Sequence, residues 1–217
     1  MGAPQESPAR LRVPPRPCVG VDMQAFTNRL WWLDATEIRT ERLMLRAISP
    51  ADAAALGHAM WAHRDHLTPW IDVPGIELSA TSWRHRTRRI AAAFVRGVQL
   101  LYAARRTGDD RLLGCVGLTP TGATCELSYW LVPAGTKQGY AREAAAALAR
   151  LAYRCAGASA TRIRCRIDNV RSAAVARALG ALPTSVRGGV QEWTLPPDRV
   201  RATGSIIVGR SRYQASC

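Results

Sequence analysis

The chain has 217 residues, 47% of them hydrophobic, and its 30 lysines and arginines outnumber 16 acids, which gives a net charge of +14. This length allows one domain with a sizeable core plus terminal extensions. No run of about 18 consecutive apolar residues occurs, so no membrane span is expected, and the opening MGAPQESPARLRVPPRP lacks the apolar stretch of a secretory signal. We therefore expect a cytoplasmic protein.

The positive charge is spread along the chain and is dense only in TSWRHRTRRI, residues 81–90. A basic excess suits an anionic partner such as nucleic acid or a polyphosphate cofactor, and it equally suits a solvated arginine-rich surface. The sequence has no zinc-finger spacing and no aromatic RNA-binding motif, so nucleic-acid binding is not expected as the main function. The six cysteines form no C-x-x-C pair, so we expect buried, reduced thiols and no metal site.

The chain is expected to divide into three parts. Residues 1–36 form an N-terminal extension, partly disordered because residues 1–22 are rich in proline and arginine and lack hydrophobic periodicity, although residues 23–38 could dock as a short helix. Residues 37–197 form the single domain. Residues 198–217 form a C-terminal tail, in which the SIIV segment could add a short strand.

The first half of the domain alternates strand and helix signals. Residues 42–46 alternate with period two, which predicts a strand. Ser49, followed by a proline, predicts the N-terminus of a helix through residues 51–63. Two prolines predict a loop over residues 66–75, and a second helix should follow over residues 79–96.

The second half continues with strands and an alanine-rich helix. The expected elements are strands at 98–105, 112–119 and 123–132, a helix at 139–157, a strand at 161–167, a helix at 171–179 and a strand at 190–195. In the strand at 161–167, Ile163, Cys165 and Ile167 should share one face. This order predicts an α/β (α+β) domain, with a mixed sheet flanked by helices.

The segment LVPAGTKQGYAREAAAAL, residues 131–148, leads from a strand through a glycine turn into a helix. The first N–H groups of such a helix have no partners within it and lie at the positive end of its dipole, so they can bind phosphate. Gly139 and Ala141 would let a pyrophosphate approach the backbone, and Lys137 adds a positive charge. Plain strand-to-helix connections have the same pattern, so this segment alone does not identify a phosphate site.

Three segments in order strengthen the hypothesis. IRTERLMLRAISPADAAAL (38–56), ELSYWLVPAGTKQGYAREA (126–144) and IDNVRSAAVARALGA (167–181) resemble the GNAT superfamily of N-acetyltransferases, in particular its branch of ribosomal-protein N-terminal acetyltransferases. The resemblance covers roughly residues 37–195. It implies a mostly antiparallel central sheet, with a splay between the fourth and fifth expected strands. The sequence departs from the branch at Thr136, where Trp is frequent, and at Lys137, where Gly is usual.

The resemblance also implies that acetyl-CoA, or another acyl-CoA, is the co-substrate. Its phosphates would bind the loop before the alanine-rich helix, and its pantetheine arm would lie beside the end of the preceding strand. A backbone N–H near Leu131 would polarise the thioester carbonyl. The implied cofactor-binding residues are Trp130, Leu131, Val132, Lys137, Gln138, Gly139, Tyr140, Ala141, Arg142, Asn169 and Ser172.

Acyl transfer to an amine also needs a proton acceptor and a proton donor. Glu126 is the candidate base, directly or through a water, although it could be a solvated or arginine-paired strand residue. By resemblance, the Ser172 hydroxyl would meet the CoA sulfur and protonate the leaving thiolate, with Tyr140 and Tyr129 as alternative acids. Asn169 equally fits a helix N-cap, and Ser172 a capping or packing serine.

In this architecture the two helices after the first strand, with their connecting loop, would wall the acceptor groove. The implied acceptor residues are His66, Trp70, Asp72 and His85. The carboxylate of Asp72 could hold a cationic amine. The neighbouring arginines, Arg88 and Arg89, also fit a solvated helix face.

The expected function is therefore transfer of an acetyl group from acetyl-CoA to a primary amine by direct attack. The amine would belong to a protein N-terminus or a small molecule, and the enzyme would be a monomer or a homodimer. Alternatives are a succinyl or other acyl donor, an acyl-CoA-binding or nucleic-acid-binding module without turnover, and a structural partner in a larger assembly.

Overall fold

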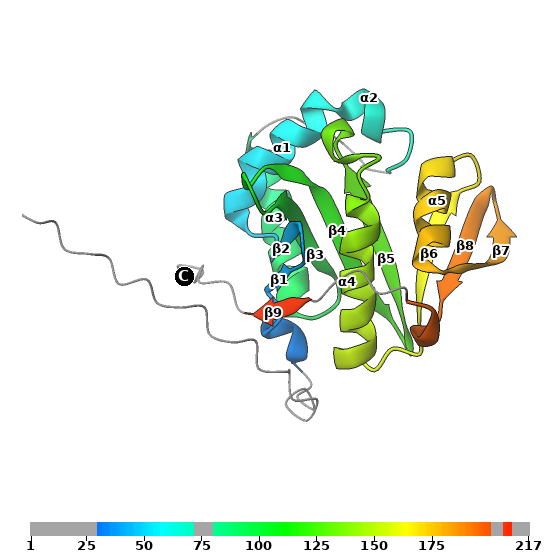
Figure 1. Cartoon of the computed structure of the whole chain (residues 1–217). Helices are drawn as coiled ribbons and strands as arrows, with labels where there is room; N and C mark the ends of the chain where they lie inside the picture. The colour runs from blue at the N-terminus through cyan, green and yellow to red at the C-terminus, as the bar shows by residue number, and fades with distance from the viewer. Residues whose placement is uncertain (1–29, 72–79, 201–205, 210–217) are drawn as a thin grey trace, which may run out of the picture.

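The computed structural model describes residues 30–71, 80–200 and 206–209. Within them, nine strands form one sheet in the order β7-β8-β6-β5-β4-β3-β2-β1-β9 (Figure 1). Neighbouring strands are antiparallel except β5 and β6, which are parallel. The strands are β1 (Glu37–Arg39), β2 (Leu43–Ala47), β3 (Leu100–Arg106), β4 (Leu112–Thr121), β5 (Thr124–Leu131), β6 (Ala160–Arg166), β7 (Leu182–Arg187), β8 (Val190–Leu195) and β9 (Ile207–Gly209).

Helices cover both faces of this sheet. α4 and α5 lie on one face, and α1 and α3 lie on the other (Figure 1). No helix in the described part combines the length and the apolar character that a membrane crossing needs. The helices are α1 (Ala53–Ala62), α2 (Arg64–Leu67), α3 (Ala80–Val95), α4 (Tyr140–Cys155) and α5 (Val170–Leu179), with 3-10 turns at Trp31–Leu33, Pro50–Asp52, Pro133–Gly135 and Pro197–Arg199.

The structure confirms the expected fold class, a mixed and mostly antiparallel sheet flanked by helices. It also adds elements. β1 and β7 were not predicted, and α2 occupies the start of the segment expected as a loop. Of residues 23–38, where a short helix was considered possible, residues 23–29 lie outside the described part, and the rest contains a 3-10 turn at Trp31–Leu33 and the strand β1. In the segment expected as a C-terminal tail, β9 pairs with β1, at the place where a short strand was considered possible.

The prediction that Ile167 belongs to the strand expected at 161–167, on the same face as Ile163 and Cys165, was wrong. β6 ends at Arg166, and the Ile167 side chain is 61% exposed. The chain turns there, because the Ile167 N–H donates to the Gly189 carbonyl and Asp168 pairs with Arg166. Ile163 and Cys165 are buried as expected.

The central helix packs closely on the sheet because it is made mainly of alanine. Residues 144–149 (AAAALA) are each at most 1% exposed. Alanine is the best helix former and has no side-chain entropy to lose, so the same residues favour the helix and let its backbone approach β4 and β5. Leu148 and Leu151 fill the space between this helix and the buried side of the sheet.

The parallel pairing of β5 and β6 is short. Its register runs from Thr124 opposite Ala160 to Leu127 opposite Ile163, and no paired residues follow, although both strands continue in the described chain. The two strands diverge beyond that point (Figure 1). This is the expected splay, and it leaves the last four residues of β5 bonded to β4 alone.

A glycine in β4 allows the end of β5 to lie where it does. Gly114 lies opposite Leu131 and has a φ of +152°, and a Cβ added to it would lie 2.0 Å from the Trp130 carbonyl oxygen. A side chain at this position would therefore displace β5 at the mouth of the splay.

We predict that Gly114→Ala lowers the free energy of unfolding by about 2–4 kcal/mol, because the added methyl group overlaps backbone and the torsion is strained. Urea denaturation measures this change. The control is Gly108→Ala, which meets no atom within 4 Å and should change stability by less than about 0.5 kcal/mol. Equal losses in the two variants would contradict the close β4–β5 contact.

Candidate active site

The loop before α4 has the backbone geometry of an anion site. Lys137 and Gly139 have left-handed torsions, with φ of +60° and +80°, and Gly139 is the N-cap of α4. No side chain of the described chain caps this helix, so the amides of Tyr140, Ala141 and Arg142 lack acceptors within it. Lys137 and the glycine are exposed, so these amides and one ammonium group can face a phosphate.

A buried carboxylate in the first turn of α4 ties this loop to the β1–β2 turn. Glu143 is 5% exposed and accepts hydrogen bonds from the Thr40 hydroxyl (2.6 Å), the Arg42 N–H (2.9 Å) and Arg42 Nε (2.7 Å). Arg42 also donates to the Gln138 carbonyl at 2.9 Å and lies over the Tyr140 ring. The network fixes the loop and neutralises the one acid of that turn, so no free carboxylate there opposes an anion.

At the splay, the end of β5 presents backbone groups that have no partner strand. The Val132 N–H donates to the Leu113 carbonyl at 2.8 Å, so the Val132 N–H is already used. Because antiparallel residues alternate in direction, the N–H and C=O of Leu131 and of Tyr129 point away from β4 and toward β6. β6 does not pair there, so the Leu131 N–H and the N–H and C=O of Tyr129 are available to an extended ligand. The Trp130 side chain points to the sheet face that carries α1 and α3, and it packs against the hydrophobic cluster on that face.

The N-terminus of α5 lies across the splay from β5. Asn169 caps this helix, because its Oδ1 accepts from the Ser172 N–H at 3.0 Å. The Ser172 Oγ lies 3.0 Å from the Tyr129 hydroxyl, which also donates to the Ser172 carbonyl at 3.2 Å. Burial raises the pKa of Tyr129 above its ordinary value, so this phenol stays protonated at neutral pH. Tyr129 therefore joins the two diverging elements through Ser172.

Glu126 lies earlier on β5, between buried Cys125 and Leu127, so its side chain points toward the face that carries α1 and α3. It is half-buried, with Arg162 of β6 as its neighbour in register. Among the described residues, no group lies within hydrogen-bond or ion-pair distance of its carboxylate. The arginine-paired alternative is therefore not seen.

His66 of α2 lies at the open end of the splay. Burial lowers the pKa of its imidazole, and the positive charges of Arg171 and His63 lower it further, whereas a hydrogen bond with the Leu131 backbone raises it. His66 therefore lies near the end of β5 and the start of α5, and its lowered pKa favours the neutral imidazole at pH 7.

The other expected acceptor residues are more scattered. Trp70 is 41% exposed, and His85 lies on the exposed side of α3, away from the sheet. Asp72 lies outside the described residues. The structure therefore brings His66 to the splay and does not bring His85 there.

Three residues of the site were missed by the sequence prediction. Arg42 and Arg171 gave no local signal, because their partners lie on other elements of the fold. Glu143 did give a signal in the sequence, because acids are common in the first turn of a helix and Glu143 lies in the 126–144 segment that resembles the GNAT superfamily. Together with the residues above, the site fits a molecule with a phosphate end and an extended arm.

No curated protein matches the sequence, but solved structures resemble it. Mycobacterium smegmatis RimJ in complex with CoA-disulfide is 20% identical, with a TM-score of 0.67 over 77% of this chain and 88% of that one. An acetyltransferase from Salmonella typhimurium, described as modifying the N-terminal serine of a 50S ribosomal subunit protein, is 20% identical, with a TM-score of 0.62 over 72% and 96%. A microcin self-immunity acetyltransferase in complex with acetyl-CoA and AMP is 14% identical, with a TM-score of 0.64 over 72% and 93%.

The fold is that of the solved acetyltransferases to which the chain is similar. The family described as "Acetyltransferase (GNAT) domain" matches residues 42–182, more than half of the chain. The chain belongs to this family, and it is an N-acetyltransferase that uses acetyl-CoA.

We predict that Glu143→Gln lowers the free energy of unfolding by about 1–3 kcal/mol and raises the KM for acetyl-CoA with little change in kcat. The reason is that a buried, charge-assisted network that holds the loop is weakened. Urea denaturation and initial rates measure the two effects. Asp168→Asn is the matched control, because it removes a carboxylate from an exposed ion pair and should change stability by less than about 1 kcal/mol. An unchanged KM in Glu143→Gln would contradict the role of this network.

Proposed function

We propose that the chain acetylates the α-amino group of a protein N-terminus. The observation that carries this proposal is the open end of the splay, where the Leu131 backbone, His66 and the N-terminus of α5 meet. The similarity to an acetyltransferase described as modifying the N-terminal serine of a ribosomal protein supports this acceptor class. The cytoplasmic location expected from the sequence stays a prediction.

Acetyl-CoA supplies an acetyl group activated as a thioester. Lys137 and the amides of residues 138–142 would hold its phosphates, and the unpaired backbone groups of Tyr129 would orient its arm. The Leu131 N–H would donate to the acetyl carbonyl oxygen, which stabilises the negative charge that develops there. The Asn169 side chain, which uses its oxygen to cap α5, keeps its amide N–H groups for a second contact.

His66 would be the proton acceptor, because its pKa is lowered and the Leu131 backbone is among the groups that influence it. If one ring nitrogen donated its N–H to the Leu131 carbonyl, the other would carry a lone pair and could take a proton from the attacking amine. Glu126 lies five residues before Leu131, about 16 Å along the strand at about 3.3 Å per residue. At that distance from Leu131, Glu126 would reach the amine only through water, and the amine would have to lie nearer to Tyr129 than to Leu131.

Ser172 would donate its hydroxyl proton to the leaving thiolate. The Tyr129 hydroxyl, 3.0 Å away, holds the serine oxygen in place and can return a proton to it. Since the pKa of Tyr129 is raised by burial, the phenol remains a donor throughout the pH range of the reaction.

A succinyl or other acidic acyl donor is a second candidate, favoured by one observation. Arg171 lies in the first turn of α5 and its positive charge lowers the pKa of His66, so this arginine would be near the position proposed for the acyl group. A guanidinium there could pair with the terminal carboxylate of a succinyl chain.

We predict that the protein releases CoA from acetyl-CoA in the presence of short peptides with free N-termini, and that Ser172→Ala lowers kcat by about 10²-fold or more. A thiol reagent measures the release of CoA. The same assay is run with succinyl-CoA as the donor, for the wild type and for Arg171→Gln. A rate with N-acetylated peptides equal to that with free peptides would contradict the proposed acceptor. A preference for succinyl-CoA that Arg171→Gln abolishes would replace the acetyl donor by the second candidate.

We predict that His66→Gln lowers kcat/KM by about 10²-fold at pH 8 and that the ratio of wild type to variant falls toward one on acidification. Protonated imidazole cannot accept the amine proton, and the pKa of His66 lies below its ordinary value of 6.5, so the ratio should be constant above about pH 7. The ionisation of the acceptor amine cancels in this ratio. Glu126→Gln is the matched variant. If the ratio of wild-type to variant kcat/KM depends on pH for Glu126→Gln and is constant for His66→Gln, the base is Glu126 instead.

A further inference from the structure

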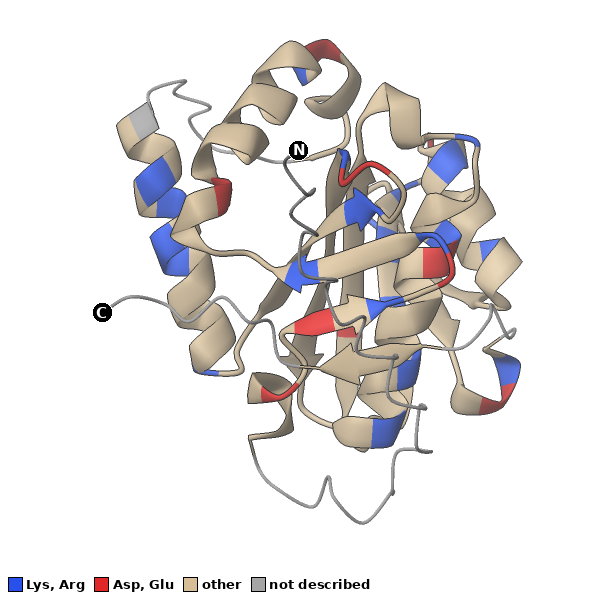
Figure 2. Ribbon diagram, turned by 60° about the vertical axis from the view of Figure 1, so that its left-hand side comes forward, with Lys and Arg blue, Asp and Glu red and all other residues tan. Residues whose placement is uncertain are grey.

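The exposed side of α3 is strongly basic, and the acetyl-transfer site does not use it. Arg84, Arg88 and Arg89 are exposed, as are His85 and, one residue beyond the helix, Arg96. The helix sequence contains no acid. Figure 2 shows basic bands along this helix with no acidic one among them.

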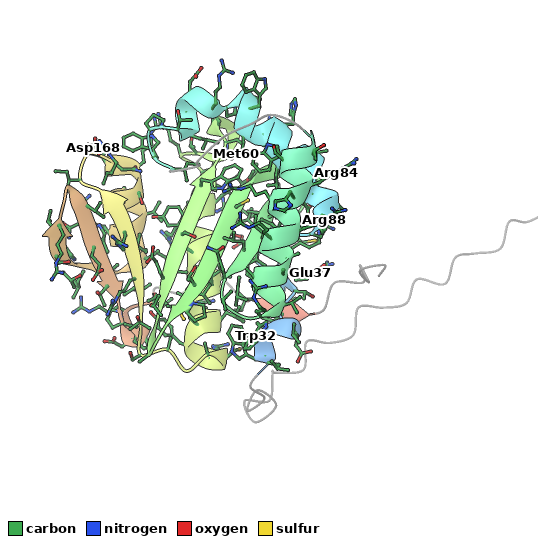
Figure 3. All side chains as sticks on the ribbon, turned by 180° about the vertical axis from the view of Figure 1, so that it is seen from behind. Trp32, Glu37, Met60, Arg84, Arg88 and Asp168 are labelled. Carbon is green, nitrogen blue, oxygen red and sulfur yellow. The ribbon has the colours of Figure 1, made fainter. Side chains whose placement is uncertain are left out.

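These side chains form one stripe. The five positions fall within an arc of about 140° at 3.6 residues per turn and span about 18 Å from first to last. The opposite side of the helix carries Trp83, Thr87 and Phe94, which are buried. Figure 3 shows Arg84 and Arg88 on the side of α3 away from the splay.

The charges of this stripe are not neutralised within the described chain. None of the salt bridges among the described residues involves α3, and Arg86, beside the stripe, lies over the Trp83 ring. A row of unpaired guanidinium groups on a rigid helix is suited to a regularly spaced polyanion.

The composition of the stripe favours a phosphate backbone over a protein surface. Protein interfaces depend on a buried apolar or aromatic centre. The described part of α3 exposes one large apolar side chain, Val95, at its end. Binding through this face would therefore rest on charge, which is how proteins hold nucleic-acid backbones without reading sequence.

We propose that the basic stripe of α3, formed by Arg84, His85, Arg88, Arg89 and Arg96, docks the enzyme on the phosphate backbone of structured RNA. The choice of RNA over DNA rests on the proposed function: the similar acetyltransferase described as modifying a ribosomal protein supports an acceptor that lies beside RNA. The stripe and the splay lie on different parts of the molecule, so docking leaves the acetyl-transfer site free.

Fluorescence anisotropy with a labelled 20-base-pair RNA duplex tests the proposal on the full chain. We expect micromolar binding at low salt. The triple variant Arg84→Gln, Arg88→Gln and Arg89→Gln should bind at least tenfold more weakly and reduce the slope of log K against log salt by about two to three, at about 0.9 per phosphate contact. The charge-matched control, Arg111→Gln with Arg154→Gln and Arg187→Gln, lies on other exposed surfaces and should change binding less than threefold.

Equal losses in the two triple variants, or no binding by the wild type, would overturn the proposal. Competition by polyglutamate as strong as that by unlabelled RNA would replace RNA by an acidic protein, and at least tenfold tighter binding to the matching DNA duplex would overturn the choice of RNA. CoA release with a short peptide should be unchanged in both triple variants, which shows that they fold. If the wild type shows no acetyl transfer, the proposed function is refuted, but the RNA-binding measurement is unaffected.

Discussion

The early end of the pairing between β5 and β6 is the constraint on which the site depends. Parallel strands that stayed paired would satisfy each other's backbone groups along their whole length. Here the pairing stops at Leu127 and Ile163, and the last residues of β5 remain bonded to β4 alone. The unpaired edge faces the N-terminus of α5, and Tyr129 and Ser172 join the two sides. The splay is thus an opening within one sheet, and side chains of both halves reach it.

The second requirement is a rigid loop at the start of α4. Backbone amides bind an anion well only if their positions are fixed before the anion arrives. The buried Glu143 and the partly exposed Arg42 fix them, because the arginine also holds the Gln138 carbonyl. Lys137, where the resemblance led us to expect glycine, adopts a left-handed torsion with φ of +60°. The backbone shape that glycine would provide is therefore kept, with an added positive charge.

Much of the fold followed from the sequence because its signals are local. The alternation in residues 42–46 gave β2, and the proline after Ser49 marked the entry to α1, where Asp52 completes a capping box. The alanine-rich run gave α4. β7 could not be predicted in this way, because it is exposed along most of its length and contains Pro183 next to a register shift, so it has neither alternation nor a hydrophobic run.

The site was predictable only in part, for a related reason. The phosphate loop and the Asn169 cap lie within short segments and carry their own motifs, whereas the proximity of His66 to Leu131 depends on where the fold places α2. The resemblance to the GNAT superfamily predicted that His66 lines the acceptor groove. Its proximity to Leu131 at the end of β5 could be found only from the structure. Glu126 was chosen as the base from its place on the strand alone, and strand geometry puts it far from Leu131.

The most direct test of the account is backbone hydrogen exchange with and without saturating coenzyme A, with binding checked by calorimetry. If the splay holds the arm and the α4 loop holds the phosphates, amides in residues 128–132 and 137–143 should exchange at least tenfold more slowly in the complex. Amides of β1 and β9 should not change. Unchanged exchange of residues 128–132 in a protein that demonstrably binds coenzyme A would contradict the assignment of the splay as the acyl-transfer site.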